Sequence, residues 1–270
     1  MSDTFGSAAS AVKGPGDSGR PLGASRPVPI VDVVAVPLLV LGALLTTCAF
    51  VLGFTTAPLV HGAEVDVPAL IGGQMVTNKL LLSQKIFYFH MPVAVVSLVA
   101  LLFTALFGVL FLVKRDRRFD LSAKVATEVA LVFILMTMVT GEMWERFEWG
   151  VWWTWEPRLT SYLILMLMVV AYFVLRNAVD DPERRAVYSS VFGIIAAINA
   201  PISLLITRLV PSGVHPVVFR TDSGLPPPML LPLLLALMGM SCIAFSLYCI
   251  RLREQRLRER LEVLKKRLED

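Results

Sequence analysis

The chain has 270 residues, of which 56% are hydrophobic and 17% are charged, and its formal net charge is +4. Soluble domains carry about 25% charged residues, so this composition excludes a soluble globule of the same size and favours an integral membrane protein. An intrinsically disordered chain and a disulfide-rich secreted scaffold are excluded as well. The three cysteines form no CxxC motif, which excludes a thioredoxin-like redox site.

Six apolar runs have the roughly 20 residues that a membrane-spanning helix needs. They lie at 33–54, 86–113, 125–143, 159–175, 186–207 and 229–250. The sequence therefore predicts an all-α integral membrane protein with six transmembrane helices in one domain, residues 30–250.

Basic residues are divided unequally between the two sets of connections. Nineteen of the 25 lysines and arginines lie before the first run, after the second and fourth runs, or after the sixth. Because basic loops stay in the cytoplasm, we expect both termini to be cytoplasmic. The loops at about 55–85, 141–158 and 208–228 are then expected to face outside.

The two ends of the chain differ in composition from the apolar runs. Residues 1–29 are rich in Gly, Ser, Ala and Pro and are predicted to be a disordered cytoplasmic extension. Residues 251–270 are highly charged and predict an amphipathic cytoplasmic helix. This helix carries a leucine stripe with a 4-3-4 spacing, made of Leu257, Leu261, Leu264 and Leu268. Two interpretations stay open: a helix against anionic lipid, or a short coiled-coil contact with a partner or a second copy.

All five tryptophans lie within twelve residues of the second outer loop, at Trp144, Trp149, Trp152, Trp153 and Trp155. An aromatic belt would spread over many helix ends and both faces of the membrane. The clustering favours a flat apolar surface for a large planar ligand. If this segment is helical, one face combines three of these rings with a carboxylate: Trp149, Trp152, Trp153 and Glu156.

The residues that follow the tryptophans predict the start of the next helix. Glu156 precedes Pro157, so we expect Glu156 to cap that helix and Pro157 to take its first position. Arg158 then lies beside the aromatic surface. It is available either to a ligand carboxylate or to Glu156 or a lipid phosphate.

All three histidines are predicted on the outer side. His61 lies in the first outer loop, His90 at the outer end of the second span, and His215 in the third outer loop. Each alone is an ordinary polar surface residue. Together with the tryptophans and an arginine they fit haem, a planar macrocycle with two carboxylates and an iron that accepts imidazole ligands.

Three segments resemble the cytochrome c assembly family of haem-handling proteins, which carry a tryptophan-rich WWD motif. These segments are Trp149-Gly-Val-Trp-Trp-Thr-Trp-Glu-Pro-Arg-Leu-Thr-Ser161, Ile86-Phe-Tyr-Phe-His-Met-Pro92, and Ile198-Asn-Ala-Pro-Ile202 followed by His215. Six spans, with the tryptophan loop between the third and fourth, resemble the haem exporter protein C (CcmC) branch. The resemblance covers residues 33–250.

The resemblance implies a haem-binding and transfer protein of the bacterial inner membrane rather than an enzyme, with an assisting role in chaperone haem attachment left open. Haem b, as transient cargo, would be held at the periplasmic face with His90 and His215 as iron ligands. The implied platform is Trp149, Trp152, Trp153, Trp155, Glu156 and Arg158. The implied partners are a periplasmic haem chaperone (CcmE), the ABC-type subunits CcmA and CcmB, the small protein CcmD and the lipid bilayer, with no nucleic acid.

The sequence departs from the family pattern in several places. Glu156 stands where the motif usually has Asp, and three acidic residues precede the motif, at Glu142, Glu145 and Glu148. The alternatives are a six-helix transporter and a b-haem-bearing respiratory subunit. The first needs ionisable groups near the middle of the membrane, and the second usually takes histidines from within helices, whereas this chain offers little of either.

Overall fold

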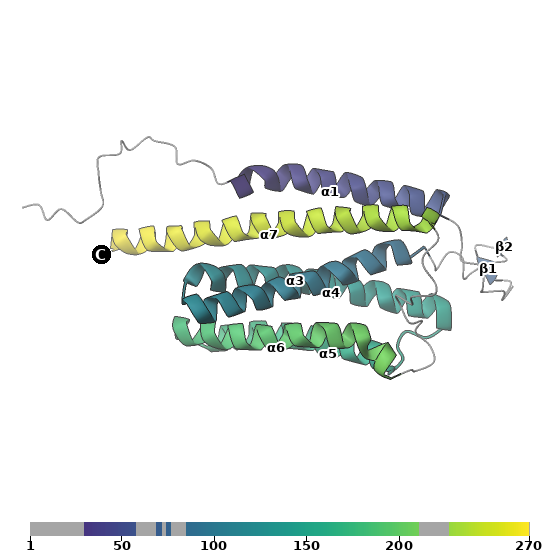
Figure 1. Cartoon of the computed structure of the whole chain (residues 1–270). Coiled ribbons are helices and arrows are strands. Elements are labelled where there is room, and N and C mark those ends of the chain that lie inside the picture. The colour runs from purple at the N-terminus through teal and green to yellow at the C-terminus, as the bar shows by residue number, and fades with distance from the viewer. Residues whose placement is uncertain (1–29, 58–68, 72–73, 77–84, 211–226, 270) are drawn as a thin grey trace, which may run out of the picture.

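The computed structural model describes residues 30–57, 69–71, 74–76, 85–210 and 227–269 (Figure 1). It contains six long helices: α1 (Ile30–Thr55), α3 (Phe87–Lys114), α4 (Arg117–Trp149), α5 (Pro157–Ala178), α6 (Pro182–Leu209) and α7 (Pro227–Glu269). All six are long and apolar enough to cross a membrane. The prediction of an all-α protein with six transmembrane helices is confirmed, while the expected extension at residues 1–29 lies outside the described residues.

A short β-hairpin is a secondary-structure element that the sequence did not indicate. Its strands, β1 (Ala69–Ile71) and β2 (Gln74–Val76), pair antiparallel with Leu70 opposite Met75. Figure 1 places this hairpin beyond the ends of α1 and α3, at the end of the bundle where α4 leads into α5. We call this end the tryptophan end and the opposite one the basic end.

α4 and α7 extend furthest beyond the apolar runs that predicted them. α4 begins at Arg117, because the Asp116 side chain caps it by accepting the Arg118 backbone N–H at 2.9 Å. α7 continues without a break to Glu269, so the predicted tail helix is an extension of the sixth span. Charged residues are well tolerated in these extra turns at the helix ends, because their long side chains reach water from there.

The helices pack as three neighbouring pairs. Figure 1 shows α1 beside α7 on one side, α3 beside α4 in the middle and α5 beside α6 on the other side. α3 contacts α4, α6 and α7, and two apolar clusters surround it. Leu101, Ile134 and Leu165 belong to the cluster shared with α5 and α6. Val96 and Phe133 belong to the cluster shared with α7.

α1 is attached mainly through α7, by a seam of small residues. A Cβ on Gly239 would collide with Thr46 Oγ1 and would lie 2.9 Å from the Gly42 carbonyl oxygen. Only glycine allows the two backbones to approach this closely, a common device between membrane helices. Ser246 Oγ adds a hydrogen bond of 2.5 Å to the Ala35 carbonyl.

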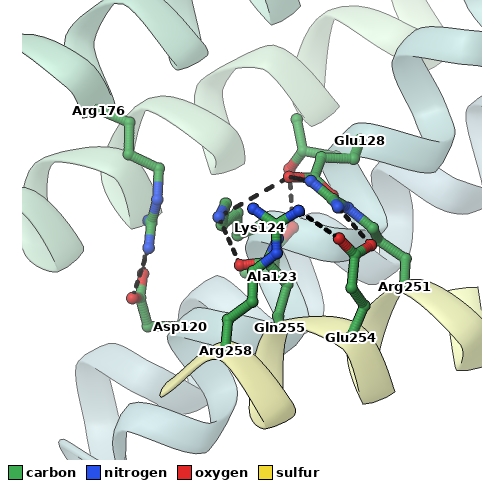
Figure 2. Close-up of polar contacts among 10 residues, drawn as sticks. Asp120, Ala123, Lys124, Glu128, Arg176, Arg251, Glu254, Gln255 and Arg258 are labelled. Carbon is green, nitrogen blue, oxygen red and sulfur yellow. Dashed lines mark hydrogen bonds and ion pairs between the residues drawn. The ribbon is translucent and has the colours of Figure 1, made fainter. Parts of the chain in front are cut away.

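Ion pairs join the helices at the basic end (Figure 2). Arg176 of α5 donates to both carboxylate oxygens of Asp120 of α4, each at 2.7 Å, and the two side chains are only about 10% exposed. Arg251 of α7 donates to Glu128 of α4 at 2.6 Å. These pairs fix the position of α4 against its neighbours on two sides.

We predict that Asp120→Ala or Arg176→Ala destabilises the protein by about 3–5 kcal/mol, because either change leaves a buried charge without its partner. Thermal unfolding in detergent measures the loss. The double variant Asp120→Leu/Arg176→Met should recover most of it, since no charge remains buried. Arg118→Ala, which breaks an exposed pair with Asp116, is the control and should change the midpoint little. Equal losses in control and test variants would contradict this account.

Candidate functional site

The connection between α4 and α5 holds most of the predicted site. α4 ends at Trp149 because Gly150 takes a left-handed conformation with φ 75°, and no regular helix forms again until Pro157. The conditional prediction of one helical face joining Trp149, Trp152, Trp153 and Glu156 is therefore wrong. Trp152, Trp153 and Trp155 sit on a loop that Gly150 turns away from the helix axis, whereas Trp144 and Trp149 belong to α4.

Two tryptophan rings of this loop are open to the surroundings. Trp152 is 60% exposed and Trp155 is 77% exposed. The Arg146 guanidinium lies over the Trp152 ring at 5.7 Å and also donates to the Gly150 carbonyl. Trp153 meets Trp155 edge to face at 5.6 Å. The loop therefore presents large flat rings held by their neighbours, and the side chain of Trp149 lies outside the described part.

The start of α5 follows the sequence prediction. Glu156 is the N-cap residue and Pro157 takes the first turn, although the Glu156 side chain makes no capping hydrogen bond. The Glu156 carboxylate is buried instead. Arg158, in the first turn, is half-buried and makes no ion pair with any residue that the structure describes. A half-buried guanidinium of this kind has a strong tendency to bind an anion.

Several buried polar groups near this loop have no hydrogen-bond partner within the described ranges. They are the Glu145 carboxylate, Trp153 Nε1, Thr154 Oγ1 and Thr160 Oγ1. Buried polar groups are nearly always hydrogen-bonded in native proteins. Their concentration beside the exposed rings and Arg158 is consistent with a surface that completes its hydrogen bonds with a bound molecule, and it fits a ligand that is both flat and polar at its edge.

His90 lies in the first turn of α3, as predicted, and α4 holds its ring on three sides. Nδ1 is 2.9 Å from Thr140 Oγ1, and the Trp144 ring meets the imidazole edge to face at 5.7 Å. Gly141 faces the ring so closely that a Cβ there would lie 3.2 Å from Cε1. Thr140, Gly141 and Trp144 of α4 thus enclose the imidazole on three sides. We call these three residues the His90 seat.

The hydrogen bonds of Thr140 favour one tautomer of His90. The Thr140 hydroxyl has two backbone acceptors for its hydrogen, the Met136 carbonyl at 2.7 Å and the Thr137 carbonyl at 3.2 Å. When the hydroxyl donates to either carbonyl, its oxygen accepts from His90, which is the tautomer with the proton on Nδ1 and the lone pair on Nε2. Metal-binding histidines commonly donate their second nitrogen to an acceptor in this way, which fixes the ring and raises its basicity.

Sequence reasoning identified His90 but not its seat. Thr140 and Gly141 were only part of the lead-in to the tryptophan motif, and their contact with a residue 50 positions earlier depends on the packing of α3 against α4. His61 and His215 lie outside the described residues. Their approach to His90 stays a prediction.

Lys85 fixes the end of α1 next to this site. Its side chain is 9% exposed, and Nζ donates to the carbonyls of Gly53 and Ala57 at 2.6 and 2.7 Å. Burial lowers the pKa of Lys85 from its ordinary value. The ammonium satisfies carbonyls at the C-terminus of α1 that have no partner within the helix.

Comparison with known proteins decides the family. The family model described as heme exporter protein C matches residues 76–267. The chain belongs to the heme exporter protein C family. The matched range includes His90, the tryptophan loop and His215, and it leaves α1 outside. The resemblance found in the sequence is thereby confirmed.

Individual relatives agree. "Heme exporter protein C" of Paracoccus denitrificans is 30% identical over 183 residues, 67% of this chain and 76% of the relative. The Bradyrhizobium diazoefficiens protein of the same name is 32% identical over 182 residues, 67% of this chain and 69% of the relative. That of Escherichia coli K12 is 28% identical over 171 residues, 63% and 69% of the two chains. The family handles haem for cytochrome c maturation, and family membership together with the six apolar helices indicates a multi-pass membrane protein of bacterial type.

We predict that Thr140→Val changes the tautomer of His90, because valine offers no acceptor to the Nδ1 proton. With only three histidines in the chain, ¹⁵N-labelled imidazoles are resolvable by NMR in detergent. One wild-type histidine should show the Nδ1-protonated form, and Thr140→Val should convert its signal to a mixture. Thr140→Ser, which keeps the acceptor, and Thr127→Val, at the basic end of α4, are the controls. An unchanged spectrum in Thr140→Val would refute the assignment.

Proposed function

We propose that this protein binds haem b at the periplasmic face of the inner membrane and delivers it to a periplasmic haem chaperone of the CcmE type. The observation that carries the proposal is the oriented imidazole of His90 at the same end of the bundle as the exposed tryptophans and Arg158. Membership of the heme exporter protein C family supports the choice of haem. The unequal loop charges support an outward-facing tryptophan end with both termini in the cytoplasm.

Two imidazoles hold the iron in this proposal. His90 offers its Nε2 lone pair from the seat on α4, and His215 supplies the second ligand from the third outer loop. Haem itself supplies an iron that takes imidazole on both sides and exchanges these ligands with an incoming protein. The Thr140 acceptor keeps His90 in the binding tautomer whether or not haem is present.

The rest of the site holds the macrocycle. Trp149, Trp152, Trp153 and Trp155 cover its apolar faces and keep water from the iron ligands. Arg158 pairs with a propionate. Glu156, buried at the head of α5, holds the loop and the arginine in place. These residues bind and orient, and no bond-making group among them is needed for transfer.

Release is an exchange of ligands and contacts. The chaperone competes for the iron and for the propionate, while the ABC-type subunits CcmA and CcmB and the small protein CcmD associate with the membrane helices. The protein acts as a carrier and not as an enzyme. Its helices form one membrane domain, residues 30–250, between an N-terminal extension and a cytoplasmic tail.

We expect detergent-purified wild-type protein to show the visible spectrum of haem with two imidazole ligands. His90→Ala and His215→Ala should each abolish it, and Thr140→Val should weaken haem binding about tenfold or more through the loss of the outer hydrogen bond. His61→Ala is the matched control and should keep the spectrum. A wild-type protein that is purified without haem and whose visible spectrum shows no binding when haem is added would contradict the proposal.

The role of Arg158 is tested with a modified ligand. Arg158→Ala should weaken binding of haem about 10- to 100-fold, as expected for a lost charge-assisted hydrogen bond. The same change should leave binding of haem dimethyl ester unaltered, because its carboxylates are blocked. Haem titrations of both proteins with both ligands form a double-mutant cycle. Equal losses with haem and ester would assign Arg158 to packing instead of propionate recognition.

A further inference from the structure

The tail of α7 is a free-standing helix. Leu252 and Gln255 are its last buried residues, and every residue from 256 to 269 is exposed. These fourteen residues extend about 21 Å at 1.5 Å per residue. Figure 1 shows them continuing past the ends of α3, α4 and α6.

The exposed helix carries a continuous apolar seam. Leu257, Leu261, Leu264 and Leu268 are 46%, 64%, 55% and 88% exposed. Their spacing gives alternating d and a positions of a heptad repeat, the pattern by which two helices pack side by side. Nothing in the described part of the chain covers them. Because the tail is already helical as part of α7, a partner helix has no nucleation cost to overcome on this side.

The charges beside the seam are all of one sign. The flanking e positions are Arg258 and Lys265, and the g positions are Arg260 and Arg267. In a coiled coil these positions face their counterparts on the other helix. A second copy of the tail, parallel or antiparallel, would place basic residues against basic residues. Residues 1–29 contain a single leucine and two acidic residues, so they do not supply a matching helix either.

A lipid surface does not match the direction of the tail. α7 is a single helix whose last proline is Pro232 and whose last glycine is Gly239. Arg251 bonds to Glu128, and Lys124 bonds to Gln255 at 3.0 Å, so the helix leaves the bundle held against α4 (Figure 2). The tail continues along the axis of the span and not in the membrane plane, where an interfacial helix lies.

We propose that the α7 tail docks an amphipathic helix of a partner protein that has leucine-type residues in its seam and Asp or Glu in the positions flanking it. Attraction between basic and acidic flanks selects the partner, and the leucines supply the buried area. This surface lies at the opposite end of the bundle from the haem site. The proposal does not depend on haem binding.

The first test uses the full chain in nanodiscs of neutral phosphatidylcholine and a synthetic three-heptad peptide with leucine at a and d and glutamate at e and g. A second peptide carries lysine at e and g. The glutamate peptide should bind more tightly, on the order of tenfold or more, from the sum of several charge pairs. Equal binding of both peptides, or binding of neither, would overturn the proposal.

Variants separate the seam from the outer face of the same helix. Leu261→Gln/Leu264→Gln should lower binding of the glutamate peptide at least about tenfold, since the contact loses two buried leucines. Arg260→Glu/Arg267→Glu should abolish the preference for the glutamate peptide, because two acidic and two basic flanking positions then face each peptide. The matched control Glu259→Gln/Glu262→Gln changes the outer face and should bind as wild type does. A loss in the control as large as in the seam variant would assign the binding to helix charge in general.

The second test identifies the occupant in the native cells. A benzoylphenylalanine photocrosslinker at position 261 should capture a protein segment whose sequence, read by mass spectrometry, has a leucine seam with acidic flanks. The same group at position 262, on the outer face, should capture this segment far less. Crosslinks from position 261 to lipid alone, to a second copy of the chain, or to nothing above the level at 262 would each overturn the proposal.

Discussion

The organisation of this protein depends on the absence of water inside the bundle. Backbone polar groups are satisfied within helices, and side-chain polar groups must then find partners at the two ends. The basic end finds them within the chain, through the paired carboxylates and guanidiniums of Asp120 with Arg176 and Glu128 with Arg251. Buried polar groups without a hydrogen-bond partner in the described ranges occur toward both ends, with the hydroxyls of Tyr172, Ser189 and Ser190 toward the basic end and the Glu145 carboxylate and Trp153 Nε1 at the tryptophan end. Every ion pair among the described residues, however, lies at the basic end or on the α7 tail.

The His90 seat shows how this division serves function. The imidazole is fixed by three residues of one turn of α4, so its position is set by the packing of two rigid helices and not by the tryptophan loop. Under the proposed function, this separation would let the loop adjust around haem while the two helices keep the His90 imidazole in one place.

Much of the fold was predictable because a membrane-spanning helix is recognisable in a sequence from the length and hydrophobicity of its apolar run alone. The start of α5 at Pro157 and the place of His90 near the start of α3 were predictable from local residue types. The loop after Trp149 was not predicted, since the expectation of a continuous helix through this segment took no account of the left-handed turn at Gly150. The seat formed by Thr140 and Gly141 was also missed, because only the tertiary contact between α3 and α4 brings a hydroxyl to an imidazole 50 residues away.

The attachment of α1 to α7 has a consequence for how the protein is made. Among the six described spans, α1 leaves the ribosome first, yet α7, the helix that carries its glycine seam, leaves last and begins about 170 residues after α1 ends. At about 5–20 residues per second, α1 waits in the lipid for roughly 10–30 s before its partner arrives. Three side chains near the end of α1 are made before that partner: Thr55 and Thr56 donate to the Val51 and Leu52 carbonyls, and Lys85 donates to those of Gly53 and Ala57. The C-terminus of α1 thus has its own hydrogen-bond donors, one of them from the segment that leads into α3, before α7 completes the bundle.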